Sequence, residues 1–156
     1  MVALNLLPKE TFKGLLEMEL KRSQRYQNFA SVLLVEAYQE ERVNQINGSN
    51  DHLSQRVAAL MRSEIRETDL LGSFDENVLM IVLLHSDTNT SVGVAHRLGT
   101  LLGGYLGDGE GASARFCVGG ACFPTHATDL SSICQRAQQM LEKARDLQAE
   151  PIQFVP

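Results

Sequence analysis

The chain has 156 residues, of which 44% are hydrophobic and 21% charged. This length suits a domain with a proper hydrophobic core, and the composition excludes the disordered and fibrous classes. The formal net charge of −5 argues against a general nucleic-acid binder, which carries a basic surface, although a local pair of arginines is enough to bind a nucleotide ligand.

The three cysteines, Cys117, Cys122 and Cys134, cannot all pair. Cys117 and Cys122 lie five residues apart in an expected strand, so their side chains point to opposite faces and no disulfide is predicted. This favours a cytoplasmic location. The N-terminus has no signal pattern, and no run of about 18 apolar residues is present, so no direct membrane insertion is expected.

The first half of the chain predicts two helices and a strand. Pro8 suits a first helical turn, and apolar residues follow at helical spacing over Phe12–Leu20. Phe29–Ala37 is a nearly continuous apolar run, which predicts a buried central strand. The polar stretch Asn44–Asn50 predicts a loop, and an apolar face over Leu53–Ile65 predicts the second helix.

The middle of the chain predicts a β-hairpin followed by a helix. Asp69–Phe74 and Val78–Leu84 read as strands joined by the polar turn Asp75–Asn77. Val94–Leu102 has apolar residues at helical spacing, and Gly103-Gly104 is expected to end that helix.

The last third predicts a strand, a helix and a short edge strand. The strand Ala114–Phe123 contains Gly119-Gly120, which implies close backbone packing or a bulge. A helix over Leu130–Ala144 and an edge strand over Ile152–Val155 complete the order α-β-α-β-β-α-β-α-β. A hairpin within this order excludes a purely parallel sheet. We therefore expect a single domain of residues 1–156: an α+β sandwich with a mixed central sheet of about five strands flanked by helices.

Several landmarks resemble those of GGDEF domains, in the family's order. Leu4–Pro8 resembles the opening Leu-Thr-Gly-Leu-Pro, and the hairpin after Asp69-Leu70 resembles the stretch that carries the Gly-Gly-Asp/Glu-Glu-Phe signature. Val118–Pro124 resembles the Ile-Gly-Val-Ala-x-Tyr-Pro strand, and Ala137–Ala144 the closing helix. The resemblance spans the chain and implies a GGDEF, nucleotidyl-cyclase-like fold.

The signature turn differs from that of active members, which join two GTP molecules with the help of Mg²⁺. That reaction needs two carboxylates on the metal and glycines that admit the nucleotide. Counted without gaps from Asp69, the signature falls on Asp75-Glu76-Asn77-Val78-Leu79. In this register acids replace the glycines and Val78 replaces the metal-binding glutamate. A one-residue slip that places Asp75-Glu76 on the acidic pair still puts Ser73-Phe74 where the glycines belong.

Glu36 stands where the family has its other metal-binding aspartate, but a solvated strand-end carboxylate is the more common role of such a residue. The guanine-holding residues that follow in the family are absent. From these differences we predict a degenerate domain that is not an enzyme, with no catalytic residues, no metal and no cofactor.

Arg66-Glu67-Thr68-Asp69 matches the family's Arg-x-x-Asp inhibitory site, which binds a stacked pair of cyclic di-GMP molecules. Arginine offers planar donors to phosphate or to the guanine Hoogsteen edge, and aspartate accepts from guanine N1–H and N2–H. Arg97 falls where the family adds a second arginine. The ligand-binding prediction is therefore Arg66, Asp69 and Arg97. The alternative is that they are ordinary surface charges.

Two functions remain open from the sequence. The first is a cyclic di-GMP receptor in bacterial signalling, similar to the degenerate GGDEF domain of the Pel exopolysaccharide regulator. The second is a nucleotide-independent interaction or dimerisation module of a signalling or secretion assembly. A homodimer or another protein partner is expected in both cases. A GTP-binding regulatory domain is less favoured because the guanine-holding residues are missing.

Overall fold

The helices and strands follow one another in the predicted order. The computed structural model describes residues 8–39, 49–75, 77–106, 114–125, 129–147 and 150–155. Its elements are α1 (Lys9–Tyr26), β1 (Ala30–Gln39), α2 (Ser49–Glu64), β2 (Leu70–Asp75), β3 (Val78–Leu84), α3 (Thr88–Leu106), β4 (Ala114–Phe123), α4 (Leu130–Asp146) and β5 (Ile152–Phe154).

The five strands form one mixed sheet in the order β2-β3-β1-β4-β5. Strand β1 is central, as its continuous apolar run predicted, and it pairs antiparallel with both β3 and β4. The β2–β3 hairpin is antiparallel, whereas β5 pairs parallel with β4 at the sheet edge. The predicted α+β class is confirmed.

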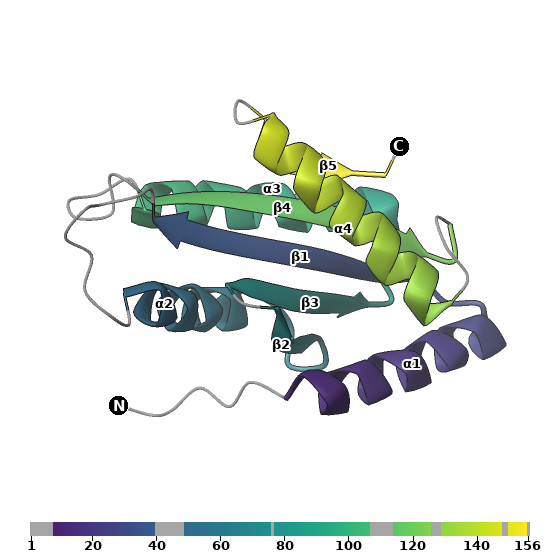
Figure 1. The fold of residues 1–156 in the computed structure, drawn as a ribbon. Coiled ribbons are helices and arrows are strands. Elements are labelled where there is room, and N and C mark those ends of the chain that lie inside the picture. Colours follow the sequence, from purple (N-terminus) through teal and green to yellow (C-terminus); the bar gives the residue numbers. More distant parts are fainter. Residues whose placement is uncertain are drawn as a thin grey trace.

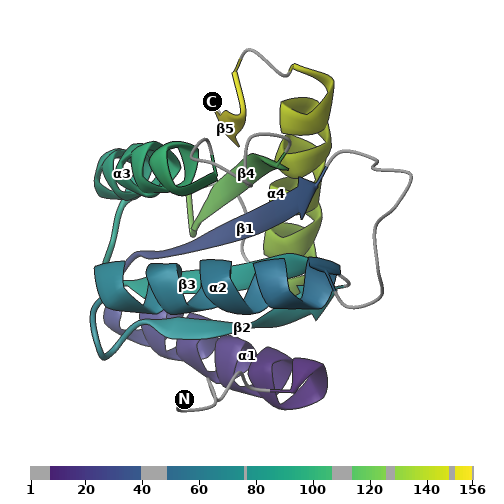
Figure 2. The same cartoon turned by 90° about the vertical axis from the view of Figure 1, so that its left-hand side faces the viewer.

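The helices cover both faces of the sheet (Figure 1 and Figure 2). Helices α1 and α4 pack on one face, where Phe12 and Ile133 meet inward residues of β1 such as Val32. Helices α2 and α3 pack on the other face, where Met61 and Leu98 belong to the second core. Because successive strand residues point to opposite faces, a strand buried on both sides is mostly apolar, which explains the run Val32–Val35 in β1.

Helix α3 is longer than predicted at both ends. It begins at Thr88 and runs through Gly103-Gly104 to Leu106, so these glycines do not end it. A glycine costs a helix only about 1 kcal/mol, and burial of Leu98 and Leu102 in the core holds the helix together. Helix α2 begins at Ser49, inside the stretch predicted as a loop.

Gly119 marks a close approach of helix and sheet, as predicted. A Cβ on Gly119 would lie 2.6 Å from the carbonyl oxygen of Ala137 on α4. Cys117, Cys122 and Cys134 form no disulfide. In the part of the chain that the structure describes, no helix is long and apolar enough to cross a bilayer. The opening landmark Leu4–Leu7 lies outside the described residues.

Candidate ligand-binding site

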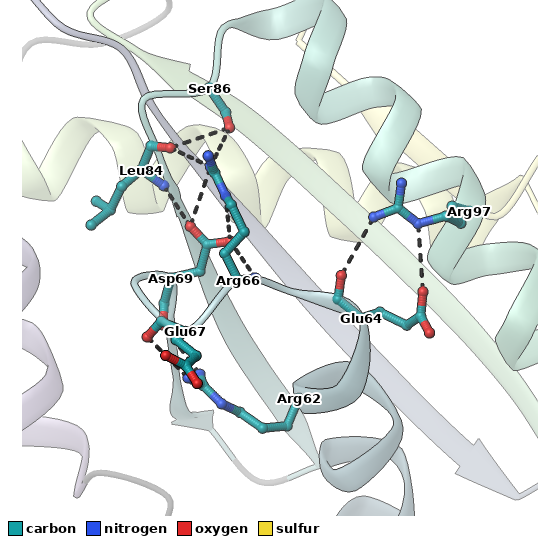
Figure 3. A network of polar contacts seen from close by, with 8 residues as sticks. All are labelled: Arg62, Glu64, Arg66, Glu67, Asp69, Leu84, Ser86 and Arg97. Carbon is teal, nitrogen blue, oxygen red and sulfur yellow. Dashed lines mark hydrogen bonds and ion pairs between the residues drawn. The ribbon is translucent and has the colours of Figure 1, made fainter.

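The residues of the predicted ligand site gather around two connections at one end of the sheet (Figure 3). Arg66 and Asp69 lie between the end of α2 at Glu64 and the start of β2 at Leu70. The β3–α3 turn follows Leu84 and lies beside them, because Leu70 pairs with Val82 near the end of the hairpin.

Asp69 is a buried carboxylate that organises the α2–β2 connection. Its side chain is 2% exposed. Oδ2 accepts from the backbone N–H of Arg66 at 3.0 Å, and Oδ1 accepts from the backbone N–H of Leu84 at 3.1 Å. The Asp69 N–H in turn donates to the Arg66 carbonyl at 3.0 Å. One carboxylate therefore closes a tight turn and ties it to the end of β3.

Arg66 is exposed but held in place. Its side chain is 57% exposed, and Nε and Nη2 donate to Oδ2 and Oδ1 of Asp69, each at 3.4 Å. Nη2 also donates to the Leu84 carbonyl and to Ser86 Oγ, the latter at 3.2 Å. The guanidinium is thus fixed on one side by the protein, while Nη1 makes no hydrogen bond to any other described residue.

Two further arginines lie in the same network. Arg97, on α3, is 54% exposed, and its Nε lies 3.6 Å from Glu64 Oε1, with Nη2 donating to the Glu64 carbonyl at 3.4 Å. Arg62, on α2, donates to the carbonyls of Asp69 at 3.1 Å and Glu67 at 3.2 Å. Exposed ion pairs such as Arg97–Glu64 contribute about 0–1 kcal/mol, so a ligand can displace this pair at little cost.

The structure therefore brings Arg66 and Arg97 to the same end of the fold, on the two sides of the segment that leaves α2. It gives Asp69 a different setting from the one predicted, because a carboxylate that is 2% exposed has little surface for a guanine. Sequence reasoning missed Ser86 and the Leu84 carbonyl. A backbone carbonyl leaves no sequence signal, and a single serine after a strand is too common to single out.

The signature turn lies at the opposite end of the β2–β3 hairpin. Asp75 ends β2 and is exposed, Asn77 adopts a left-handed conformation with φ 64°, and Glu76 lies outside the described residues. Val78 and Leu79 are buried, 5% and 4% exposed. About six strand residues at 3.3 Å each separate this turn from Asp69, so the two sites do not overlap.

Glu36 lies close to that turn and is engaged by α4. It pairs with Val78 across the β1–β3 register. Its carboxylate accepts from Arg145 Nε at 2.7 Å and from Nη2 at 3.2 Å, and this interaction raises the pKa of Arg145. Among the described residues, no group of three or more His, Cys, Asp or Glu side chains is arranged to hold a metal ion.

The comparisons with known proteins agree on one family. Residues 5–150 match the family model described as diguanylate cyclase, GGDEF domain. The structure is similar to the active GGEEF domain of a diguanylate cyclase from Vibrio cholerae, with a TM-score of 0.84 and 16% identity over 97% of this chain and 99% of that one. No curated protein matches the sequence.

Two other similar structures were solved with a bound molecule, one with a nucleotide and one with a protein. The GGDEF domain of DgcB from Caulobacter crescentus, solved in complex with c-di-GMP, has a TM-score of 0.78 and 9% identity, covering 99% of this chain and 94% of that one. Diguanylate cyclase SiaD from Pseudomonas aeruginosa, solved with its activator SiaC, has a TM-score of 0.81 and 21% identity, covering 96% of this chain and 59% of that one. The resemblance to GGDEF domains is confirmed.

The prediction that the chain is not an enzyme is wrong. The matching family is one of diguanylate cyclases, and an active member shares the fold. The prediction rested on the residue types of the turn, read without gaps from Asp69 and also with a one-residue slip. The family match spans residues 5–150 and includes this turn, so a difference of residue types in one turn does not place the chain outside a family of enzymes.

Proposed function

Since the chain belongs to the diguanylate cyclase GGDEF family, we propose that it binds cyclic di-GMP through Arg66 and Arg97 and serves as a regulatory domain in signalling. The observation that carries the proposal is the arrangement of these two exposed arginines. Each is held by an acidic partner at the same end of the sheet, at a distance from the signature turn.

The chemistry of the two arginines suits a cyclic dinucleotide. A guanidinium donates to the O6 and N7 of guanine or to phosphate oxygens, and its flat face stacks on a base. The Arg66 side chain is 57% exposed, while Asp69 holds its Nε and Nη2. In this proposal Asp69 orients Arg66 instead of contacting guanine. DgcB, a structural relative, was solved in complex with c-di-GMP, which supports this class of ligand.

The charges around the site are balanced. Three arginines (Arg62, Arg66 and Arg97) lie among three acids (Glu64, Glu67 and Asp69) (Figure 3). General attraction of an anionic ligand is therefore weak, and binding depends on directed hydrogen bonds and stacking. We expect the affinity to depend little on salt. A stacked pair of ligands, as the family resemblance implies, would give two cyclic di-GMP molecules per site, and such a pair is able to bridge two protein surfaces.

Calorimetry of the purified chain against cyclic di-GMP tests the proposal. Arg66→Ala and Arg97→Ala should each weaken binding by about 10-fold or more, because a hydrogen bond to a charged group contributes about 1.5–3 kcal/mol. Arg22→Ala is the matched control, since Arg22 is also an exposed arginine in an ion pair, 58% exposed and 3.4 Å from Glu19. The absence of heat up to high micromolar ligand, or equal affinities for Arg66→Ala and Arg22→Ala, would refute the proposal.

A nucleotide-independent interaction module is the second candidate. The observation that favours it is the exposure of three apolar side chains on α1 and just after it: Met18 at 58%, Tyr26 at 63% and Phe29 at 42%. Met, Tyr and Phe are enriched at protein interfaces. Self-association measured by analytical ultracentrifugation, insensitive to cyclic di-GMP and lost in Tyr26→Ser, would favour this function over the first.

A further inference from the structure

Ser86 joins the exposed guanidinium of Arg66 to the end of a core strand. It lies in the β3–α3 turn and is 2% exposed. Its hydroxyl accepts from Arg66 Nη2 at 3.2 Å and donates to the Leu84 carbonyl at 3.4 Å. Because Nη2 also donates to that same carbonyl, the hydroxyl and the carbonyl together form a fixed receptor for one edge of the guanidinium.

The turn that carries this receptor is anchored from inside the protein. His85 has a left-handed backbone with φ 57°, a conformation that costs a residue with a side chain free energy and needs support from its surroundings. The Ser86 carbonyl accepts from Ser31 Oγ on β1 at 3.0 Å and from the Cys122 thiol on β4 at 3.8 Å. Ser91 Oγ on α3 donates in turn to Ser31 Oγ.

These serines form a continuous polar connection from the surface to the core. Ser31 and Ser91 are both fully buried, at 0% exposure, so neither can touch a ligand bound at Arg66. Buried hydroxyls that are fully paired fix a local geometry, because an unpaired one is costly in a medium of low dielectric constant. The β3–α3 turn is therefore held at a defined position relative to β1, β4 and α3.

We propose that Ser86 is a positioning residue for Arg66 and that Ser31 supports it from the core, an inference that rests on the proposed cyclic di-GMP site. With the hydroxyl present, the guanidinium is oriented before the ligand arrives, and little side-chain entropy is lost on binding. Without it, Nη2 keeps only part of its receptor and Arg66 samples more conformations. A buried serine on β1 thus controls ligand affinity from a distance.

Calorimetry with cyclic di-GMP tests the inference. Ser86→Ala should weaken binding by about 5-fold or more, and Ser31→Ala by a smaller factor of about 3-fold, as expected for direct and indirect support of a charged hydrogen bond. Ser63→Ala is the matched control, because the Ser63 hydroxyl donates only to the nearby Leu60 carbonyl at 2.7 Å and is exposed. If the wild-type chain binds and Ser86→Ala binds equally well, the positioning role is refuted while the proposed function stands.

A second measurement needs no ligand, and it separates a failure of this inference from a failure of the proposed function. The Nη2 protons of Arg66, which Ser86 accepts in the wild-type chain, should exchange with solvent about 5-fold faster or more in Ser86→Ala when followed by NMR, while those of Arg97 stay unchanged. Unchanged exchange at Arg66 overturns the inference even if the wild-type chain does not bind cyclic di-GMP. If Ser86→Ala does not fold, Ser86→Cys, which keeps the volume but accepts weakly, is measured with the same expectations.

Discussion

Replacing Asp69 by asparagine should destabilise the fold markedly. The carboxylate is 2% exposed, and its two oxygens accept the Arg66 and Leu84 backbone N–H groups at 3.0 and 3.1 Å. Asparagine has a single acceptor oxygen, so its NH₂ group must face at least one of these donors. Leaving a buried donor unpaired costs about 1–3 kcal/mol, and a hydrogen bond to a charged group contributes about 1.5–3 kcal/mol.

We therefore expect Asp69→Asn to lower the free energy of unfolding by about 2–4 kcal/mol. The total for a domain of this kind is about 5–15 kcal/mol, so the loss is easily measured by urea denaturation followed by circular dichroism. Asp146→Asn is the matched control, because Asp146 is exposed at the end of α4, where a substitution changes stability by about 0.5 kcal/mol or less. Equal stabilities of the two variants would refute the structural role given to Asp69.

Three further predictions concern other parts of the fold. Gly103→Ala should stabilise the fold by about 0.5–1 kcal/mol in urea denaturation, since nothing lies within 4 Å of the new Cβ. Gly119→Ala should instead lower the free energy of unfolding by about 1–3 kcal/mol. A more stable Gly119→Ala than Gly103→Ala would contradict the packing described. Hydrogen bonds to the first turn of α4 lower the pKa of its cap, Asp129, from 3.8. Its stabilisation is therefore fully present above pH 3.8 and is lost as the pH falls through the lowered pKa. Asp129→Ala should accordingly lower the thermal midpoint more at pH 7 than near pH 2. Glu36→Gln, which breaks the pair with Arg145, should cost about 1 kcal/mol or less, with a smaller difference at high salt.

Much of the fold could be predicted from the sequence because the signals were local. The continuous apolar run of β1 predicted a central strand, and the polar turn between two apolar runs predicted the β2–β3 hairpin. Helix ends were predicted less well. Gly103-Gly104 was expected to end α3, but the helix continues because burial of Leu98 and Leu102 outweighs the weak helix propensity of two glycines.

Less of the candidate site than of the fold could be predicted from the sequence. Arg66, Asp69 and Arg97 were assigned to a ligand site from their positions in the sequence, and that assignment stays a prediction. The environments of the three side chains could not be predicted. Asp69 was expected to face a ligand and is instead 2% exposed, because the turn folds its side chain back onto the end of β3. The enzyme class was predicted wrongly because the residue types of one turn were taken to decide it, whereas the family match extends over residues 5–150.

By itself, the sequence determined the α+β class, the order of elements and the family, because periodicity and motif spacing are properties of the chain. The assignment of Arg66 and Arg97 to a ligand site stays a prediction. Only the tertiary structure decided which groups those arginines meet. The receptor for Arg66 is built from a backbone carbonyl at Leu84 and a hydroxyl at Ser86, 18 and 20 residues away. The serine that anchors this turn, Ser31, is 55 residues from Ser86. Such contacts depend on how strands pair and turn, and chain order does not encode that geometry residue by residue.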